Sequence, residues 1–159
     1  MRPDWNGIYP ALTTKLTIDD KLDIPLYLKN IEAQINAGIH GCVIAGSLGE
    51  ASTLSQKEKI SLLDATIAHV DGRIPVVMNI AEQSTAKAVK AAQNAQESGA
   101  DGLMMLPPMR YLADSYETVE FYKSVANSCD LPIMVYNNPY DYKIEITISM
   151  FEELLKVSN

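Results

Sequence analysis

The stretch "CVIAGSLGEASTLSQKEK", Cys42–Lys59, carries the local signals that decide the fold. It begins with a continuous apolar run, which is typical of a parallel strand that is covered on both faces. The run stops at Gly46, and a short turn with a second glycine follows. Ser55 and Glu58 then form a capping box, the serine-to-glutamate spacing that marks the first turn of a helix. The stretch therefore predicts one strand–turn–helix unit.

The same alternation extends along the rest of the chain. Apolar runs predict five strands, at residues 7–12, 41–45, 75–79, 102–106 and 132–136. Helical patterns lie between and after them, at residues 24–35, 60–70, 84–98, 115–127 and 148–157. Asp114 or Ser115 is expected to cap the fourth helix, and a second capping box, Ser149–Glu152, is expected to start the last one. Strands that alternate with helices form a parallel sheet, so the fold class is α/β.

A weak internal repeat bears on the architecture of that sheet. The segments "AGIHGCVIA" (37–45) and "SGADGLMML" (98–106) share a Gly-x-x-Gly entry into a strand. An entry that recurs in every second unit suits a (β/α) barrel. A five-stranded doubly wound sheet of the flavodoxin type has the same alternation and about the same length. The pattern alone leaves both architectures open, and in both the functional residues lie at the carboxyl ends of the strands.

Composition excludes several classes of partner. The chain has 159 residues and a formal net charge of −7, which argues against binding to a nucleic-acid backbone. It has no apolar run long enough to span a membrane, and its start lacks the apolar core of a signal peptide, so a cytoplasmic protein is expected. Its Cys and His residues lack metal-ligand spacing. We therefore expect no metal and no cofactor.

The turn "GSLGE", residues 46–50, is the first candidate for chemistry. Gly46 and Gly49 would let the backbone approach a ligand closely, and the N–H groups of Ser47 and Leu48 could converge on an anion. The Ser47 hydroxyl could donate or accept a proton. This arrangement would suit a small carboxylate substrate. The alternative is a tight loop in which Ser47 only satisfies backbone groups.

The second candidate is Tyr136 in "VYNNP", residues 135–139. A phenol at the end of a buried strand can act as a general acid or base when a partner tunes it. The alternative is an ordinary tyrosine at a strand end, with its hydroxyl in water.

Taken in order, these segments resemble the dihydrodipicolinate synthase / N-acetylneuraminate lyase family. The matching stretches are "WNGIYPALTT" (5–14), "GSLGEASTLSQKEK" (46–59), "DGRIPVV" (71–77), "GADGLMMLPP" (99–108) and "LPIMVYNNP" (131–139). The resemblance covers essentially the whole chain. It implies the (β/α)8 barrel, of which residues 1–159 would supply the first five βα units as a single partial domain that ends before the sixth strand.

The resemblance also implies a reaction. Family members bind a 2-oxo acid as an imine on a lysine, and the imine accepts electrons when a carbon bond is made or broken. Ser47 matches the family's loop hydroxyl, usually threonine, and would relay protons. The N–H groups of Ser47 and Leu48, between Gly46 and Gly49, would hold the substrate carboxylate. Tyr136 matches the proton-shuttling tyrosine, and the family's assemblies imply a homo-oligomer, a dimer or tetramer at full length.

The chain departs from the family first at the nucleophile. The lysine that forms the imine would fall soon after Asn159, and neither Lys143 nor Lys156 matches its position. The chain alone is therefore expected to be inactive. A non-catalytic half-barrel remnant is the alternative.

Two further departures concern the substrate. Asp141 stands where the synthase has an arginine for the carboxylate of its second substrate, and a carboxylate there would repel that substrate. Met109 stands where the synthase has a second tyrosine. Both departures argue against the synthase. The segments "LPPMRY" (106–111) and "YNNP" (136–139) look more like the hydroxyproline-catabolism branch of the family, which implies deamination of the cyclic imine 1-pyrroline-4-hydroxy-2-carboxylate. The alternatives are 4-hydroxy-tetrahydrodipicolinate synthase and a pyruvate-dependent aldolase.

Overall fold

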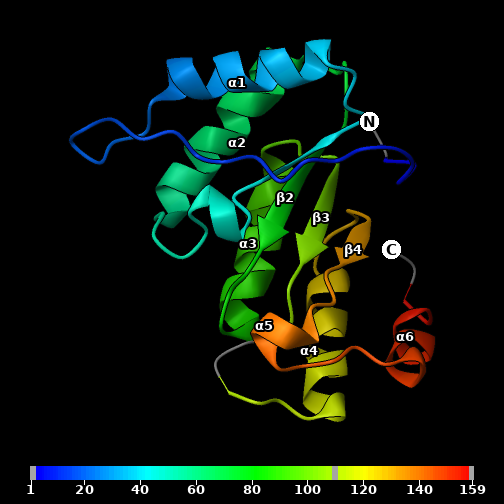
Figure 1. The fold of residues 1–159 in the computed structure, drawn as a ribbon. Coiled ribbons are helices and arrows are strands. Elements are labelled where there is room, and N and C mark those ends of the chain that lie inside the picture. The colour runs from blue at the N-terminus through cyan, green and yellow to red at the C-terminus, as the bar shows by residue number, and fades with distance from the viewer. Residues whose placement is uncertain (1–2, 109–110, 158–159) are drawn as a thin grey trace.

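The computed structural model describes residues 3–108 and 111–157, and its centre is a parallel sheet (Figure 1). Four strands lie in the order β1-β2-β3-β4. They are β1 (Cys42–Ile44), β2 (Val76–Ile80), β3 (Gly102–Met105) and β4 (Ile133–Val135). Neighbouring strands pair in parallel, so all four carboxyl ends point to one edge. The predicted α/β class and parallel pairing are confirmed.

The first predicted strand, residues 7–12, forms only an isolated parallel bridge between Ala11 and Val43. The backbone N–H of Val43 donates to the carbonyl of Pro10, and the N–H of Leu12 donates to the carbonyl of Val43. Proline has no N–H of its own, which limits the ladder at this point. The segment still lies beside β1, the next strand along the chain.

All five predicted helices are present, and two short helical turns are added. The longer helices are α1 (Ile24–Asn36), α2 (Gln56–Val70), α3 (Thr85–Glu97) and α4 (Ser115–Ala126). The capping boxes of Ser55 with Glu58 and of Asp114 with Glu117 both form. The last helix, α6 (Ile148–Leu154), is capped by Thr147, so the predicted capping box at Ser149–Glu152 is wrong. The additional turns are η1 (Ser47–Gly49) and α5 (Pro139–Tyr142).

Strands β1, β2 and β3 are buried at every position and β4 is half-buried, so side chains are covered on both faces of the sheet, as the continuous apolar character predicts. One set faces the helices and belongs to the main core, with Cys42, Ile44, Val76, Met78, Leu103 and Met105 among its members. The alternate positions form a smaller cluster on the other face, which we call the inner-face cluster: Val43, Val77, Met104 and Leu106. Tyr142, the last residue of α5, packs against the inner-face cluster.

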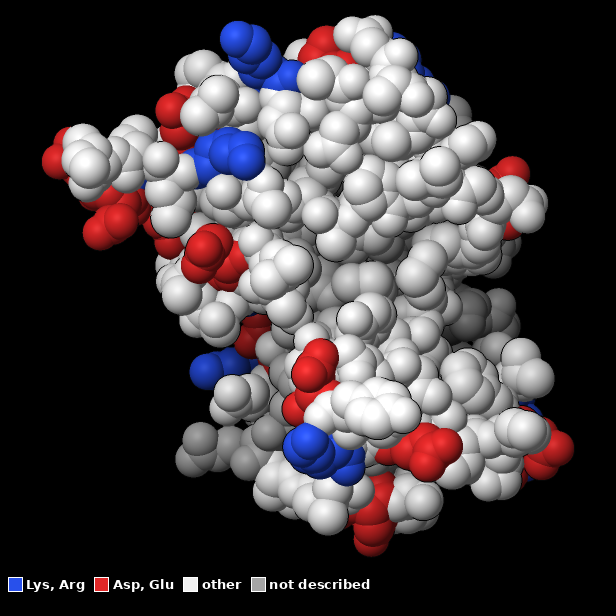
Figure 2. Space-filling view, viewed as in Figure 1, with Lys and Arg blue, Asp and Glu red and all other residues white. Residues whose placement is uncertain are grey.

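The described helices do not include one that is long and apolar enough to cross a bilayer. In the view of Figure 2, acidic and basic side chains are scattered around an uncharged central area, and Lys and Arg do not gather into a patch on this face.

Candidate active site

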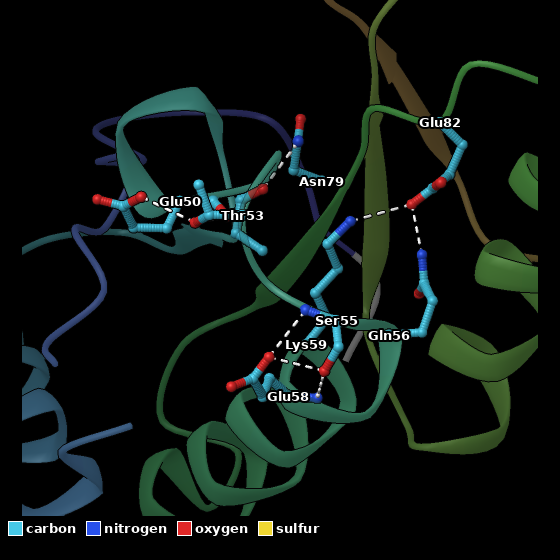
Figure 3. A network of polar contacts seen from close by, with 9 residues as sticks. Glu50, Thr53, Ser55, Gln56, Glu58, Lys59, Asn79 and Glu82 are labelled. Carbon is cyan, nitrogen blue, oxygen red and sulfur yellow. Dashed lines mark hydrogen bonds and ion pairs between the residues drawn. The ribbon is translucent and has the colours of Figure 1, made fainter. Parts of the chain in front are cut away.

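The carboxyl end of β1 leads directly into the predicted turn. Ala45 has a positive φ of 52°, which side-chain-bearing residues rarely adopt. The side chain of Asn79, from β2, holds this bend, because its Nδ2 donates to the Ala45 carbonyl at 2.9 Å (Figure 3). Asn79 is buried, and its Oδ1 has no hydrogen-bond partner among the described residues. Sequence reasoning did not single out Asn79, although a polar residue in an apolar strand was a usable signal.

The two glycines of the turn have different reasons to be glycine. Gly46 is extended, with φ −71° and ψ −177°, a conformation open to any residue. A Cβ on Gly49 would come within 2.6 Å of the Leu12 carbonyl oxygen. The hydroxyl of Thr14 also donates to the Gly49 carbonyl at 2.6 Å. Gly49 is therefore needed for packing against the N-terminal segment, a reason that the sequence did not reveal.

Residues Ser47 and Leu48 begin a 3-10 turn that Gly46 precedes. The N–H of Gly49 donates to the carbonyl of Gly46 at 2.9 Å. The first N–H groups of a helical turn have no partner inside it, so those of Ser47 and Leu48 are available to an acceptor outside the turn. The Leu48 side chain is 84% exposed and lies in solvent.

Three hydroxyl-bearing residues gather at this edge of the sheet. The Ser47 Oγ lies 2.8 Å from the Tyr142 Oη, and either atom can be the donor. The ring of Tyr136 meets the ring of Tyr142 edge-on, with centroids 5.9 Å apart. Tyr142 therefore connects Ser47 to Tyr136, the two residues that the sequence predicts for proton transfer. The sequence analysis gave Tyr142 no role.

The segment after β4 places Tyr142 through a set of local hydrogen bonds. The amide of Asn137 exchanges two hydrogen bonds with the backbone of Ile146, at 3.0 Å each. Asn138 caps α5 by accepting from the N–H of Asp141, and its amide also donates to the Asp141 carboxylate at 2.7 Å. Figure 1 shows α5 beyond the arrowheads of β2 and β3, at the carboxyl edge of the sheet.

A cleft of about 740 Å³ opens beside this cluster. Ser47 and Tyr142 line one part of it, and the segment leading into α2, the first turn of α2, the segment after β2 and the start of α3 line most of the rest. In its wall, Lys59 Nζ lies 3.0 Å from the Glu82 carboxylate, with side chains only 8% and 13% exposed (Figure 3). Gln56 donates to the same carboxylate oxygen. The Lys59 ammonium is thus held in an ion pair, an unfavourable state for an amine that must attack a carbonyl.

Lys143 and Lys156, which the sequence analysis rejected as nucleophiles, are both bonded to other groups. Lys143 has a positive φ of 61°, and its ammonium donates to the carbonyl of Tyr140. Lys156 pairs with Glu153 at 2.6 Å on α6 and its end. Met109 lies outside the described residues. Among residues 3–108 and 111–157, no group of three or more His, Cys, Asp and Glu side chains could hold a metal ion.

Comparison with known proteins gives this arrangement a context. Residues 4–159 match the Dihydrodipicolinate synthetase family. The 4-hydroxy-tetrahydrodipicolinate synthase of Methanococcoides burtonii is 32% identical over 155 residues, which are 98% of this chain and 53% of that protein. A DapA-like lyase of Rhizobium meliloti is 33% identical over 156 residues, 98% of this chain and 52% of that protein. The chain thus spans about half the length of the curated relatives it matches.

Solved structures agree with the sequence comparison. YagE from E. coli K12, a prophage protein of the dihydrodipicolinic acid synthase family in complex with pyruvate, superposes with a TM-score of 0.92. The two are 30% identical, and the match covers 97% of this chain and 52% of that one. The four-stranded sheet and its helices correspond to the N-terminal part of the family's barrel. With the matched residues, the shared fold and the ordered motifs in agreement, the chain belongs to the dihydrodipicolinate synthetase family.

Proposed function

We propose that this chain forms the N-terminal part of the reaction site of an imine-forming lyase that acts on a 2-oxo acid or a cyclic imine. The observation that carries the proposal is that Tyr142 joins Ser47, by a hydrogen bond, to Tyr136, by a ring contact, at the carboxyl edge of the sheet. Relatives named as synthases and lyases, and a related structure that holds pyruvate, support the same class of substrate.

Each residue has a chemical role in this proposal. The N–H groups of Ser47 and Leu48, between Gly46 and Gly49, hold the substrate carboxylate. The Ser47 hydroxyl gives and takes protons at the oxygen on the substrate carbon that becomes the imine. Tyr136 serves as the general acid and base for the carbon chemistry. The amine comes from a lysine beyond Asn159, the position that the family resemblance implies.

For the substrate, we propose deamination of 1-pyrroline-4-hydroxy-2-carboxylate. Asp141 supports this choice, because its carboxylate is held in α5 by Asn138 and would repel a second substrate that carries a carboxylate there. Synthase or aldolase activity is the alternative within the same chemistry. A catalytically silent half-barrel is the alternative outside it.

Borohydride trapping of the complete gene product tests the proposal. The purified protein is incubated with pyruvate or with the cyclic imine, reduced and weighed by intact mass spectrometry. A lysine amine and a ketone lose water to form an imine, and reduction fixes it, so the expected adduct from pyruvate is heavier by pyruvate less one oxygen atom. Absence of an adduct with both compounds would contradict the lyase and favour the silent half-barrel.

The choice of substrate is then determined with protein that has not been reduced, by measuring turnover of the compounds that gave an adduct. Release of ammonia from the cyclic imine supports the deaminase. Condensation of pyruvate with an aldehyde, without ammonia release, supports the synthase or aldolase alternative.

A further inference from the structure

The Ser47–Tyr142 hydroxyl pair connects segments that are 95 residues apart in the sequence. The oxygen–oxygen distance of 2.8 Å is that of a well-formed hydroxyl hydrogen bond. Tyr142 is half-buried, and its ring packs against the inner-face cluster. Its backbone N–H donates to the Asn138 carbonyl at 3.1 Å. The Tyr142 hydroxyl is therefore positioned by ring packing and by backbone bonding, independently of Ser47.

We propose that Tyr142 is the proton partner of Ser47 and sets the direction of its hydroxyl during imine formation, an inference that rests on the proposed function. Ser47 is exposed on a short turn, and its side chain alone could rotate among three staggered positions. The hydrogen bond to Tyr142 selects one of them. Tyr142 acts through Ser47, so it is a positioning residue.

Three proton transfers accompany the loss of water from the carbinolamine. When the carbinolamine loses water, the Ser47 O–H bond breaks and its proton joins the departing hydroxyl as the carbon–oxygen bond breaks. The Tyr142 O–H proton then moves to the Ser47 oxygen and restores the serine. The Tyr142 phenolate recovers a proton from water in the adjoining cleft, which both residues line. No oxidant, reductant or further reactant is required.

Tyr142 also stands between the two residues that the sequence selects. Its hydroxyl is bonded to Ser47, and its ring makes the edge contact with Tyr136. Replacing Tyr142 by phenylalanine would keep the ring packing and remove only the hydroxyl. This substitution therefore separates proton transfer from a purely structural role, in which the pair would merely fasten α5 to η1.

The test uses the complete gene product and pyruvate in D2O, with exchange of the C3 protons followed by NMR. Exchange requires the imine and its enamine but no second substrate. We expect Tyr142→Phe to slow exchange at least about tenfold, which is less than the roughly 10²–10⁴-fold of a group that transfers the proton to the substrate itself, because Tyr142 acts through Ser47. Borohydride trapping at saturating pyruvate and the melting temperature should stay close to those of the unmodified protein. The pH profile of exchange should change shape.

A matched control is available in the same short helix. Tyr140 is 86% exposed, so Tyr140→Phe removes a phenol hydroxyl from α5 without touching the pair. It should exchange at the unmodified rate. Ser47→Ala should be as slow as Tyr142→Phe, Ser47→Thr should retain most of the rate, and the double variant Ser47→Ala with Tyr142→Phe should be no slower than the slower single variant.

The outcomes separate this inference from the proposed function. If the unmodified protein traps no adduct, the proposed function fails and this inference fails with it. If adducts form and Tyr142→Phe exchanges at the unmodified rate, only the role of Tyr142 is overturned. A lower melting temperature with an unchanged pH profile would also overturn it, in favour of the structural role.

Discussion

At the scale of single residues, the two glycines of the "GSLGE" turn differ in the atoms that surround them. A methyl group on Gly49 would overlap the Leu12 carbonyl oxygen, a backbone atom that cannot rotate away. A methyl group on Gly46 would lie 3.7 Å from the Ala11 side chain, an ordinary contact. The same chemical change should therefore have opposite consequences at positions three residues apart.

We expect Gly49→Ala to lower the free energy of unfolding by about 1–3 kcal/mol, the usual cost of forcing extra atoms into a packed site. Gly46→Ala should be neutral, or stabilising by up to about 1 kcal/mol, because alanine restricts the unfolded chain. Urea titration followed by circular dichroism measures both. Equal stability of the two variants would show that the Leu12 backbone moves freely.

At the scale of elements, α2 is joined to the segment after β2 by the ion pair of Lys59 with Glu82. Both side chains are largely shielded from water, so their desolvation is compensated only while they remain paired. Gln56, one turn earlier on α2, adds a hydrogen bond to the same carboxylate. This pair fixes the wall of the cleft relative to the helix.

Removal of one partner should therefore be more costly than removal of both. We expect Glu82→Ala to destabilise the fold by about 3 kcal/mol, since it leaves the Lys59 charge buried and unpaired. Adding Lys59→Met to Glu82→Ala should recover part of that loss, and the recovery is measured by a double-mutant cycle in urea. Lys57→Met serves as the control, because Lys57 is exposed on the same turn of α2. Additive losses at Lys59 and Glu82 would contradict the coupling.

At the scale of the whole molecule, local signals predicted the elements well and the site only in part. Ser55 and Asp114 start helices as expected, since a capping box acts within one turn. Ser47 and Tyr136 were selected from the sequence because each follows a predicted strand of a parallel sheet, and their roles stay predictions. Tyr142 was not, because its role depends on a contact across 95 residues and on a four-residue helix that has no periodicity to detect. Gly49 was assigned to ligand approach, while its contact with Leu12 is equally nonlocal.

The free energy of unfolding of the whole molecule should also fall in acid, because the fold lowers the pKa of three carboxyl groups. The Arg73 guanidinium, aided by His69, lowers the pKa of Glu32. Hydrogen bonds from Ser55 lower the pKa of Glu58. The Lys156 ammonium, aided by Lys123, lowers the pKa of Glu153. Each folded-state pKa lies below the ordinary value of 4.5, so the unfolded chain binds more protons in that range. The stabilisation is fully present above pH 4.5 and is lost as the pH falls through the folded-state values.

The Glu32→Gln variant isolates one part of this acid dependence. Glu32 on α1 accepts two hydrogen bonds from Arg73, at 2.8 and 2.9 Å, so its charge contributes to holding α1 against the end of α2. The variant should be less stable than the unmodified protein at pH 7, and the difference should shrink as the pH falls below 4.5. Because the pair is partly exposed, the difference at pH 7 should also shrink in 1 M salt. Melting temperatures measured between pH 3 and 7 test this, and a difference that stays constant with pH would show that the Glu32 charge contributes nothing to folding.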